Sequence, residues 1–389
     1  MYDHSVAGEL GSLTAPPYDV ISESERQGYF AANPYNTIRL ELPELPYDEV
    51  AGLIATWVKA GALRQPDEPV LIGWTQTFTL PDGTHHERKT ILGVVGVEPY
   101  SARVVRPHER THAGPKEDRL RLIRATQVNI SPVYGLYPDP EGAVWAAAGV
   151  TGEPQSLVVD PDGTEHRIWI LSDPDALAEV EREMADRWIL IADGHHRYET
   201  AAAYRDERGP GTPADFVMMG LTALDDPGLV VLPTHRVLTE WPDGAASRLT
   251  AMPVADLAAM EAALAAADPA SPAFGLVRPD GFSLLTMAAD PSATAGGRLD
   301  TAVLEREILV PAFEMDQAKL AHDALLTYVK EATDAAALVA SGKAAAALIM
   351  RPTSKLQVAD VAEAGETMPQ KSTYFFPKLL TGIAFNPLG

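Results

Sequence analysis

The feature that most constrains this fold is a short apolar run followed by a glycine and a cluster of basic side chains. The run 188–191 has the length of one buried strand, and the residues after it are Ala192-Asp193-Gly194-His195-His196-Arg197. Alanines and charged residues between Tyr198 and Glu207 then favour a helix. The segment therefore predicts a strand, a tight glycine turn and a helix that opens with two imidazoles and a guanidinium.

This turn has the chemistry of a phosphate-binding site. A helix N-terminus offers backbone N–H groups and a partial positive charge. Arg197 can bind an oxyanion through two parallel hydrogen bonds, and His195 and His196 add side-chain donors. Two alternatives stay open. In the first, the histidines cap the helix or form hydrogen bonds in the core. In the second, Asp193 and the histidines bind a divalent metal ion, although the side chains of consecutive helical residues diverge by about 100°.

The length, net charge and cysteine content of the chain limit the possible folds and functions. A chain of 389 residues exceeds what one hydrophobic core usually serves, so we expect two or three domains. The net charge of −23 disfavours binding to nucleic acid or to an anionic membrane, because long-range repulsion opposes both. Without cysteine there are no disulfides and no thiolate chemistry. The first residues do not resemble a signal peptide, and no apolar run approaches about 18 residues, so we expect a cytoplasmic protein.

A cationic island interrupts this acidic chain. Residues 101–125 contain seven Lys or Arg against three Asp or Glu, together with His108 and His112. Such an island is typical of a binding site for a small anion, which it can also attract from solution. The alternative is a solvated helix face over 116–124, where charges of both signs alternate.

Hydrophobic patterns predict alternating strands and helices. Pairs of alternating runs surround Pro-Asp-Gly turns at 81–83, 161–163 and 279–281, and each pair predicts a β-hairpin. Ser22 and Glu25 form the capping box of a first helix. Further helices are expected at 50–60, 174–184, 255–267, 300–309, 317–320 and 333–340, and a strand at 345–350. The expected class is α+β or mixed α/β, divided into lobes 1–140, 141–242 and 243–389.

Four other segments carry polar residues that a plain scaffold does not need. They are Pro16-Pro17-Tyr18-Asp19, Pro107-His108-Glu109-Arg110-Thr111, Pro233-Thr234-His235-Arg236 and Met368-Pro369-Gln370-Lys371-Ser372-Thr373-Tyr374. Each is alternatively a turn, a cap or a surface loop. Together with the central turn, they supply the cations and carboxylates that phosphoryl transfer requires.

These motifs resemble those of known families. The strand–Asp-Gly-His-His-Arg–helix segment is similar to the phosphate-binding motif of the ParB/sulfiredoxin-like superfamily, and most of all to its version in free-serine kinases, which phosphorylate L-serine with ADP or ATP. More widely, the chain resembles the domain-of-unknown-function 1015 family. The segments that carry this resemblance include 16–21, 108–122, 129–132, 233–236 and 368–382. The resemblance implies a ParB/sulfiredoxin-like nucleotide-binding core with additional α/β lobes built on β-hairpins.

The resemblance also implies a nucleotide-dependent kinase acting on free L-serine or a related hydroxy amino acid. The turn from Gly194 to Arg197 would bind the phosphates of ATP or ADP, with His196 also catalytic. Asp193 would orient a histidine or hold Mg²⁺. Of Asp19 and Glu109, one would accept the proton of the substrate hydroxyl and the other, Glu109 in particular, would assist Mg²⁺. The remaining cofactor- or substrate-binding residues would be Arg110, His235, Arg236 and Lys371, with Ser372 and Thr373 in a phosphate lid.

Two other functions stay open. One is a nucleotide-binding regulatory protein without phosphoryl transfer. The other is a metal-dependent hydrolase with ligands among His108, His112, His195, His196 and His235, although no His-Glu-x-x-His pair fixes two of them on one helix. The lack of cysteine excludes a thiol-dependent reductase, and the acidity disfavours a DNA-partition clamp. The expected partners are a nucleotide and a small molecule, not nucleic acid or membrane; a homodimer is left open.

Overall fold

The structure, a computed structural model, describes residues 1–109, 113–314 and 325–389. The chain divides into two compact units. Unit 1 comprises Met1–Pro107, Thr111–Val230 and Pro377–Gly389, and unit 2 comprises His108–Arg110 and Val231–Phe376. Unit 2 is therefore an insertion within the sequence of unit 1. The lobe boundaries at 140 and 242 stay a prediction.

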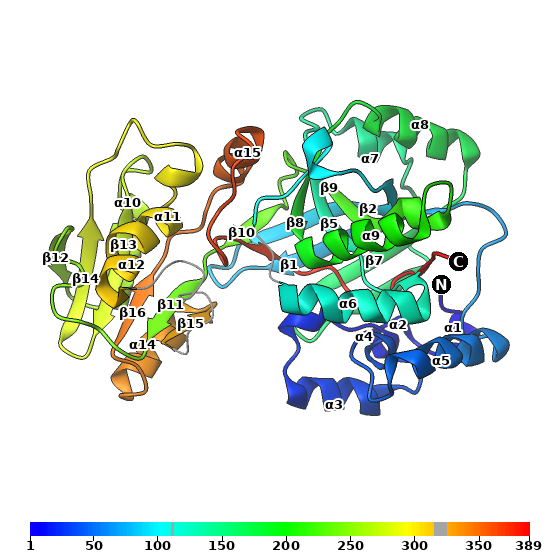
Figure 1. Ribbon diagram of the computed structural model, residues 1–389, viewed down its shortest axis with the longest axis horizontal. Coiled ribbons are helices and arrows are strands. Elements are labelled where there is room, and N and C mark those ends of the chain that lie inside the picture. Colours follow the sequence, from blue (N-terminus) through cyan, green and yellow to red (C-terminus); the bar gives the residue numbers. More distant parts are fainter. Residues whose placement is uncertain (110–112, 315–324) are drawn as a thin grey trace. The chain divides into compact units, whose positions relative to one another are not determined.

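Unit 1 is built on an eight-stranded mixed sheet (Figure 1). In spatial order its strands are β3 (Val105–Arg106), β8 (Ile189–Asp193), β5 (Val133–Tyr137), β9 (Phe216–Ala223), β2 (His85–Gly96), β1 (Leu71–Thr79), β7 (Glu165–Leu171) and β6 (Ser156–Val159). The pairs β3–β8 and β5–β9 are parallel, and the other neighbours are antiparallel. The hairpins predicted around 81–83 and 161–163 are confirmed as β1–β2 and β6–β7.

Helices cover both faces of this sheet (Figure 1). On one face α7 (Ala143–Ala147), α8 (Pro174–Met184) and α9 (His195–Arg208) pack against apolar strand residues such as Ile191 and Met219. The other side carries α1 (His4–Ala7), α2 (Leu10–Leu13), η1 (Tyr18–Val20), α3 (Glu23–Ala32), α4 (Ile38–Glu41) and α5 (Tyr47–Lys59). Helix α6 (Ala113–Thr126) packs beside α9. The capping box predicted at Ser22 and Glu25 is confirmed at the start of α3.

The C-terminal segment of unit 1 returns to the sheet. Its last strand, β18 (Asn386–Pro387), pairs with β4 (Val128–Asn129). Leu379 lies against Gly220 of β9, where a Cβ would come within 2.5 Å of the leucine side chain. The segment thus covers part of the face opposite α9, and the absent side chain at Gly220 makes room for it.

Unit 2 contains a six-stranded antiparallel sheet between two helical layers (Figure 1). Its strands in spatial order are β12 (Thr250–Val254), β14 (Gly281–Thr286), β13 (Ala273–Arg278), β16 (Ala346–Ile349), β11 (His235–Leu238) and β15 (Leu326–Val329). One face packs on α10 (Leu257–Ala266) and α14 (Ala332–Ala340), and the other on α11 (Asp300–Leu304), the π-turn Glu305–Leu309 and α12 (Val310–Phe313). Helix α15 (Lys355–Glu363) follows β16, and β10 (Val230–Leu232) pairs with β17 (Tyr374–Phe376).

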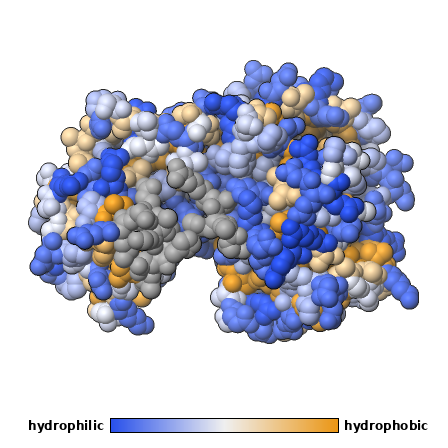
Figure 2. Space-filling view, viewed as in Figure 1, coloured by the Kyte–Doolittle hydropathy of each residue, from blue (hydrophilic) through white to orange (hydrophobic). Residues whose placement is uncertain are grey.

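The expected mixed α/β class is confirmed, and so is the third hairpin, β13–β14. The helix expected at 317–320 lies outside the described residues. The surface visible in Figure 2 is mostly hydrophilic, as expected for a chain with 54 acidic and 31 basic residues. Within the described residues, no helix combines the length and the apolar character needed to cross a membrane.

Candidate functional site

The Gly194 turn, residues 193–197, joins β8 to α9. Strand β8 is buried from Ile189 to Ala192, as its apolar sequence predicts. Gly194 is the N-cap residue of α9 and has a left-handed φ of 86°. It supplies no capping side chain, and a Cβ at this position would lie 2.8 Å from Nε of Arg197. Both the backbone conformation and the folded-back arginine therefore require glycine here.

The turn lies at an edge of the sheet where two parallel strands end. Val105 pairs with Ile189 and Arg106 with Leu190, so β3 and β8 run in the same direction. The chain consequently leaves β3 at Pro107 on the same edge as the Gly194 turn. In α/β proteins, ligands commonly bind beyond the carboxyl ends of such strands, next to a helix N-terminus.

Arg197 is used within the turn itself. Its side chain is 9% exposed, Nη2 donates to Oδ2 of Asp193 over 3.0 Å, and Nη1 donates to the carbonyl oxygen of Pro132. Nε is buried and has no hydrogen-bond partner in the described part of the chain. Each terminal nitrogen of Arg197 therefore uses one of its two N–H groups inside the protein, and the role of this guanidinium as an oxyanion ligand stays a prediction.

The charge of Arg197 is balanced by carboxylates. Burial lowers the pKa of this guanidinium, but the attraction of Asp193, Asp19 and Glu41 outweighs burial and the pKa is raised. Arg197 therefore stays protonated and fixes the shape of the turn. The neighbouring histidines occupy the first turn of α9, where His195 is buried and His196 is partly buried.

The C-terminal segment brings a second cation to the turn. Nζ of Lys378 lies 3.5 Å from Oδ1 of Asp193. The segment is anchored on the sheet because Gln76 donates to the carbonyl oxygen of Lys378 (3.0 Å) and Arg88 to that of Pro377 (2.6 Å). Asp193 thus faces a guanidinium with one oxygen and an ammonium with the other. A Mg²⁺ ion on Asp193 would have to displace these cations, so this carboxylate does not fit the metal-binding role predicted for it.

A buried carboxyl group lies beside the turn. Glu41, the last residue of α4, is 3% exposed, and its Oε1 accepts a hydrogen bond from Oγ of Ser131 over 3.1 Å. Nη1 of Arg119 lies 3.6 Å from the same oxygen. Pro132, the residue after Ser131, accepts from Arg197, so one loop holds both Glu41 and Arg197. Burial raises the pKa of Glu41, and Arg119 and Arg197 oppose this increase.

Tyr18 and Asp19 lie in the same cluster. The guanidinium of Arg119 stacks over the Tyr18 ring at 4.6 Å, and burial raises the pKa of Tyr18 to about 12. Asp19 is exposed and interacts electrostatically with Glu41 and Arg197. Of the segments singled out in the sequence, 16–19 is therefore brought to the Gly194 turn within unit 1. The sequence analysis includes Arg119 only as a member of the cationic island 101–125, and it singles out neither Glu41 nor Lys378.

The basic residues of α6 are paired with carboxylates. Lys116 bonds to Glu199 of α9 at 2.8 Å, and Arg124 pairs with Glu207 of the same helix. Arg119 contacts Asp118 at 2.6 Å. These ion pairs favour the solvated, charge-alternating helix face over an anion site for this part of the island. Arg110 and His112 lie outside the described residues.

Arg236 and His235 are buried in β11 of unit 2. Arg236 donates to the carbonyl oxygens of Thr234 and Lys371, the latter over 3.1 Å, and burial lowers its pKa. Nδ1 of His235 accepts a hydrogen bond from the backbone N–H of Met350 over 3.1 Å, and burial lowers the pKa of His235 to about 4. His235 is therefore neutral at pH 7, so it does not supply the positive charge that the sequence suggested.

The hydroxyl groups expected in a phosphate lid are engaged inside unit 2. Oγ of Ser372 is buried and donates to the carbonyl oxygen of Pro369 (2.6 Å), and it also contacts Oγ1 of Thr301 (2.9 Å). Oγ1 of Thr373 is hydrogen-bonded to Nε2 of His108 over 3.1 Å. The hydroxyl group of Ser372 therefore stabilises the fold of unit 2, and its place in a phosphate lid stays a prediction.

Glu109 and Lys371, which also have predicted roles, lie near the same loop of unit 2. Glu109 forms a parallel β-bridge with Met368, and the carbonyl oxygen of His108 accepts from the N–H of Met368 (2.7 Å). Lys371 is exposed and has a left-handed φ of 55°. Glu109 and Lys371 thus belong to unit 2, whereas Asp19 and the Gly194 turn belong to unit 1.

A metal centre has little support in the part of the chain that the structure describes, where no group of three or more metal-ligating side chains comes together.

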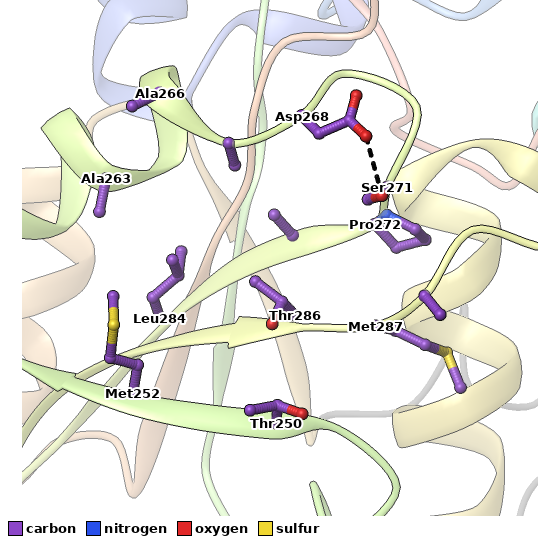
Figure 3. A pocket seen from close by; sticks show the side chains of 13 residues that line it. Thr250, Met252, Ala263, Ala266, Asp268, Ser271, Pro272, Leu284, Thr286 and Met287 are labelled. Carbon is purple, nitrogen blue, oxygen red and sulfur yellow. Dashed lines mark hydrogen bonds between the residues drawn. The ribbon is translucent and has the colours of Figure 1, made fainter.

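A cavity of about 550 Å³ in unit 2 offers few groups that could take part in a reaction (Figure 3). Its walls are mostly apolar, with Ala263, Met252 and Leu284 among them. Among its described lining residues, the one ionisable side chain is Asp268, which is bonded to Ser271 at 3.2 Å. The Gly194 turn is therefore the better candidate for chemistry.

Known proteins with related structures are distant from this chain. A free serine kinase in complex with AMP is 15% identical, with 73% of this chain and 86% of that chain covered and a TM-score of 0.40. A conserved hypothetical protein from Pyrococcus furiosus is 16% identical (73% and 90% covered, TM-score 0.38). SbnI from Staphylococcus aureus, with a C-terminal truncation, is 12% identical (75% and 85% covered, TM-score 0.41). TM-scores this low support no correspondence between individual residues.

Sequence families give a firmer result. No curated protein matches the sequence significantly. The family described as protein of unknown function (DUF1015) matches residues 2–302, which is most of the chain and includes the Gly194 turn. The protein therefore belongs to the DUF1015 family.

Proposed function

We propose that the Gly194 turn binds the phosphate groups of ATP or ADP, and that the protein is a kinase for a small hydroxylated molecule such as free L-serine. The observation that carries the proposal is the left-handed glycine at the N-cap of a 14-residue helix, directly after a buried strand. A helix N-terminus of this kind favours anions through its backbone N–H groups and its dipole. In this proposal the surrounding sheet and helices form a ParB/sulfiredoxin-like core.

The two cations at the turn have different tasks. Arg197 keeps the turn in shape, because its terminal nitrogens are bonded to Asp193 and Pro132. The ammonium of Lys378 lies 3.5 Å from Asp193, and we assign to it the contact with a phosphate oxygen. His196, partly buried in the first turn of α9, is a further donor.

Asp19 is the carboxylate of unit 1 best suited to accept the proton of a substrate hydroxyl. It is exposed, and it interacts with Arg197 and so lies close to the turn. Transfer through a loose transition state needs positioning more than a strong base. Glu109 as the second carboxylate, and Arg236 and Lys371 as cations for the transferred group or the substrate carboxylate, remain sequence-based parts of the proposal.

Mg²⁺ enters the proposal only as the ion that accompanies the nucleotide. Asp193 does not suit a resident metal, since its oxygens face Arg197 and Lys378. No step is therefore assigned to a metal held by this residue.

The test is to incubate the purified protein with labelled ATP or ADP, Mg²⁺ and pooled amino acids, and to follow both nucleotide consumption and phosphorylated products. We expect one hydroxy amino acid to be phosphorylated. Asp19→Asn should lower turnover at least tenfold and leave nucleotide affinity nearly unchanged. Nucleotide binding without turnover across the panel would replace the kinase by the regulatory alternative, and absence of binding would refute both.

A further inference from the structure

Glu41 is a buried acidic side chain that has no role in the proposed phosphate site. Oε1 of its carboxyl group contacts Ser131 at 3.1 Å and Arg119 at 3.6 Å. Within the described part of the chain, Oε2 of Glu41 receives no hydrogen bond, and the residue as a whole is 3% exposed. This oxygen is not among the fully shielded side-chain atoms that lack a hydrogen-bond partner, so it keeps some contact with solvent and is a candidate acceptor for a bound partner.

The position of Glu41 ties it to the Gly194 turn. Ser131 holds the carboxyl group, and the next residue, Pro132, holds the guanidinium of Arg197. Electrostatic interactions link Glu41 to both Arg197 and Asp19. Glu41 therefore belongs to the same cluster of side chains as the Gly194 turn, where the proposed function places the phosphates.

The surrounding charges define what Glu41 can bind. Arg119 and Arg197 already supply two positive charges to this carboxyl group, so a further cation gains little from it. Arg119 cannot move away, because it is also bonded to the carbonyl oxygen of Glu41 (2.8 Å), to Tyr47 (3.0 Å) and to Asp118 (2.6 Å). An anion would be repelled by the carboxylate. A neutral hydrogen-bond donor is the partner that remains.

We propose that Glu41 is a specificity-determining residue that accepts a hydrogen bond from an aliphatic hydroxyl group of the bound molecule. The inference rests on the proposed function, because the ligand is placed by its phosphates at the Gly194 turn. The hydroxyl belongs either to the ribose of the nucleotide or to the small-molecule acceptor. A site built to satisfy a buried carboxyl group rejects an analogue that lacks the hydroxyl, because the carboxyl group is then left unpaired.

The experiment compares ligands that differ by one hydroxyl group. Isothermal titration gives dissociation constants for ATP, 2′-deoxy-ATP and 3′-deoxy-ATP, and for L-serine and L-alanine in the presence of ADP. The unmodified protein should prefer one hydroxylated ligand by about tenfold over its deoxy counterpart. Glu41→Gln should lose that preference by weakening only the hydroxylated ligand. The pair that responds identifies the hydroxyl as that of the ribose or that of the acceptor.

The matched control is Ser131→Ala, which removes the bond to Oε1 and leaves Oε2 in place, so the preference should persist. If Glu41→Gln does not fold, Glu41→Asp keeps the charge, withdraws the carboxyl group by one methylene, and should lose the preference as well. Equal weakening of all ligands, or of none, by a folded variant would overturn the inference and leave the nucleotide site standing. Failure of the unmodified protein to bind any nucleotide would overturn the proposed function and this inference together.

Discussion

Arg197 and Arg236 are both buried arginines that the sequence assigns to anion binding, yet their hydrogen-bond partners differ in charge. Arg197 is paired with Asp193, and nearby carboxylates raise its pKa although burial lowers it. Arg236 donates to the carbonyl oxygens of Thr234 and Lys371, stacks over the Tyr328 ring at 5.3 Å, and has its pKa lowered by burial.

The comparison separates two uses of one residue type. A guanidinium paired with carboxylates is electrically balanced and mainly fixes local structure. A guanidinium held by carbonyl dipoles keeps most of its positive field, because a dipole does not cancel a charge. Arg197 is thus suited to shaping the Gly194 turn, and Arg236 is the better source of attraction for an anion in its own unit.

The largest expected effect comes from Gly194→Ala. The new Cβ would lie 2.8 Å from Nε of Arg197, in a backbone conformation with φ of 86° that costs about 1–2 kcal/mol for alanine. We expect nucleotide affinity to fall about 100-fold, measured by titration calorimetry. Gly209→Ala is the matched control, since Gly209 also has positive φ at the other end of α9 but nothing within 4 Å of its Cβ position. Equal affinity losses in both variants would show that Arg197 is not needed to shape the site.

Replacing Arg197 or Arg236 by methionine should change the pH dependence of the free energy of unfolding, and by different amounts. Arg197→Met leaves Asp193 and Glu41 without this cation, so we expect the free energy of unfolding to fall by about 3 kcal/mol at pH 7. The pKa of Glu41, which burial already raises in the folded protein, then rises further because Arg197 no longer opposes the effect of burial. The resulting penalty is therefore small below about pH 4 and grows as the pH rises.

Arg236→Met should show a smaller slope, because its bonded partners are carbonyl oxygens. Urea unfolding of both variants between pH 4 and pH 8 measures the two slopes. Equal slopes of the unfolding free energy against pH in the two variants would contradict a stronger effect of the carboxylates around Arg197.

His235, the neighbour of Arg236 in β11, gives a second test of how burial in this strand affects an ionisable side chain. Its pKa is lowered from 6.5 to about 4 in the folded protein, so the unfolded chain binds more protons between these values. Stability should consequently fall by about 2 kcal/mol as the pH drops from 7 to 5. His235→Asn keeps an acceptor for the N–H of Met350 and cannot titrate, so its unfolding free energy should change less over this range. Identical pH profiles for the two proteins would contradict the buried neutral histidine.

The smallest expected effect belongs to Lys378→Met. The ammonium lies 3.5 Å from Asp193, and the side chain is 14% exposed. Removing it should reduce nucleotide affinity about threefold to tenfold and stability by about 1 kcal/mol, because Arg197 still compensates Asp193. Thermal unfolding and nucleotide titration test this together. A loss of affinity as large as that of Gly194→Ala would assign to Lys378 the main role in holding the phosphates.

Local sequence signals predicted the elements that carry the site. The apolar run 188–191, Gly194 and the alanines after Tyr198 suffice for a strand, a turn and a helix, because each depends on near neighbours. The Pro-Asp-Gly hairpins are of the same kind. The mixed α/β class follows from these elements.

Long-range partners could not be predicted in this way. The internal use of Arg197 depends on the carbonyl oxygen of Pro132, 65 positions away. Glu41 and Lys378 reach the turn only through the tertiary fold, and nothing in their flanking residues marks them. The neutrality of His235 likewise follows from burial in a sheet whose strands come from distant parts of the chain.

The insertion of unit 2 into the sequence of unit 1 has a consequence for biosynthesis. Residues Pro377–Gly389 complete unit 1, and they leave the ribosome only after all of Val231–Phe376 has been made. Until then Gly220 has no leucine against it and Asp193 has no ammonium beside it. The Gly194 turn therefore acquires its complete charge pattern only after the ribosome has passed the whole of unit 2 and Lys378 has been added.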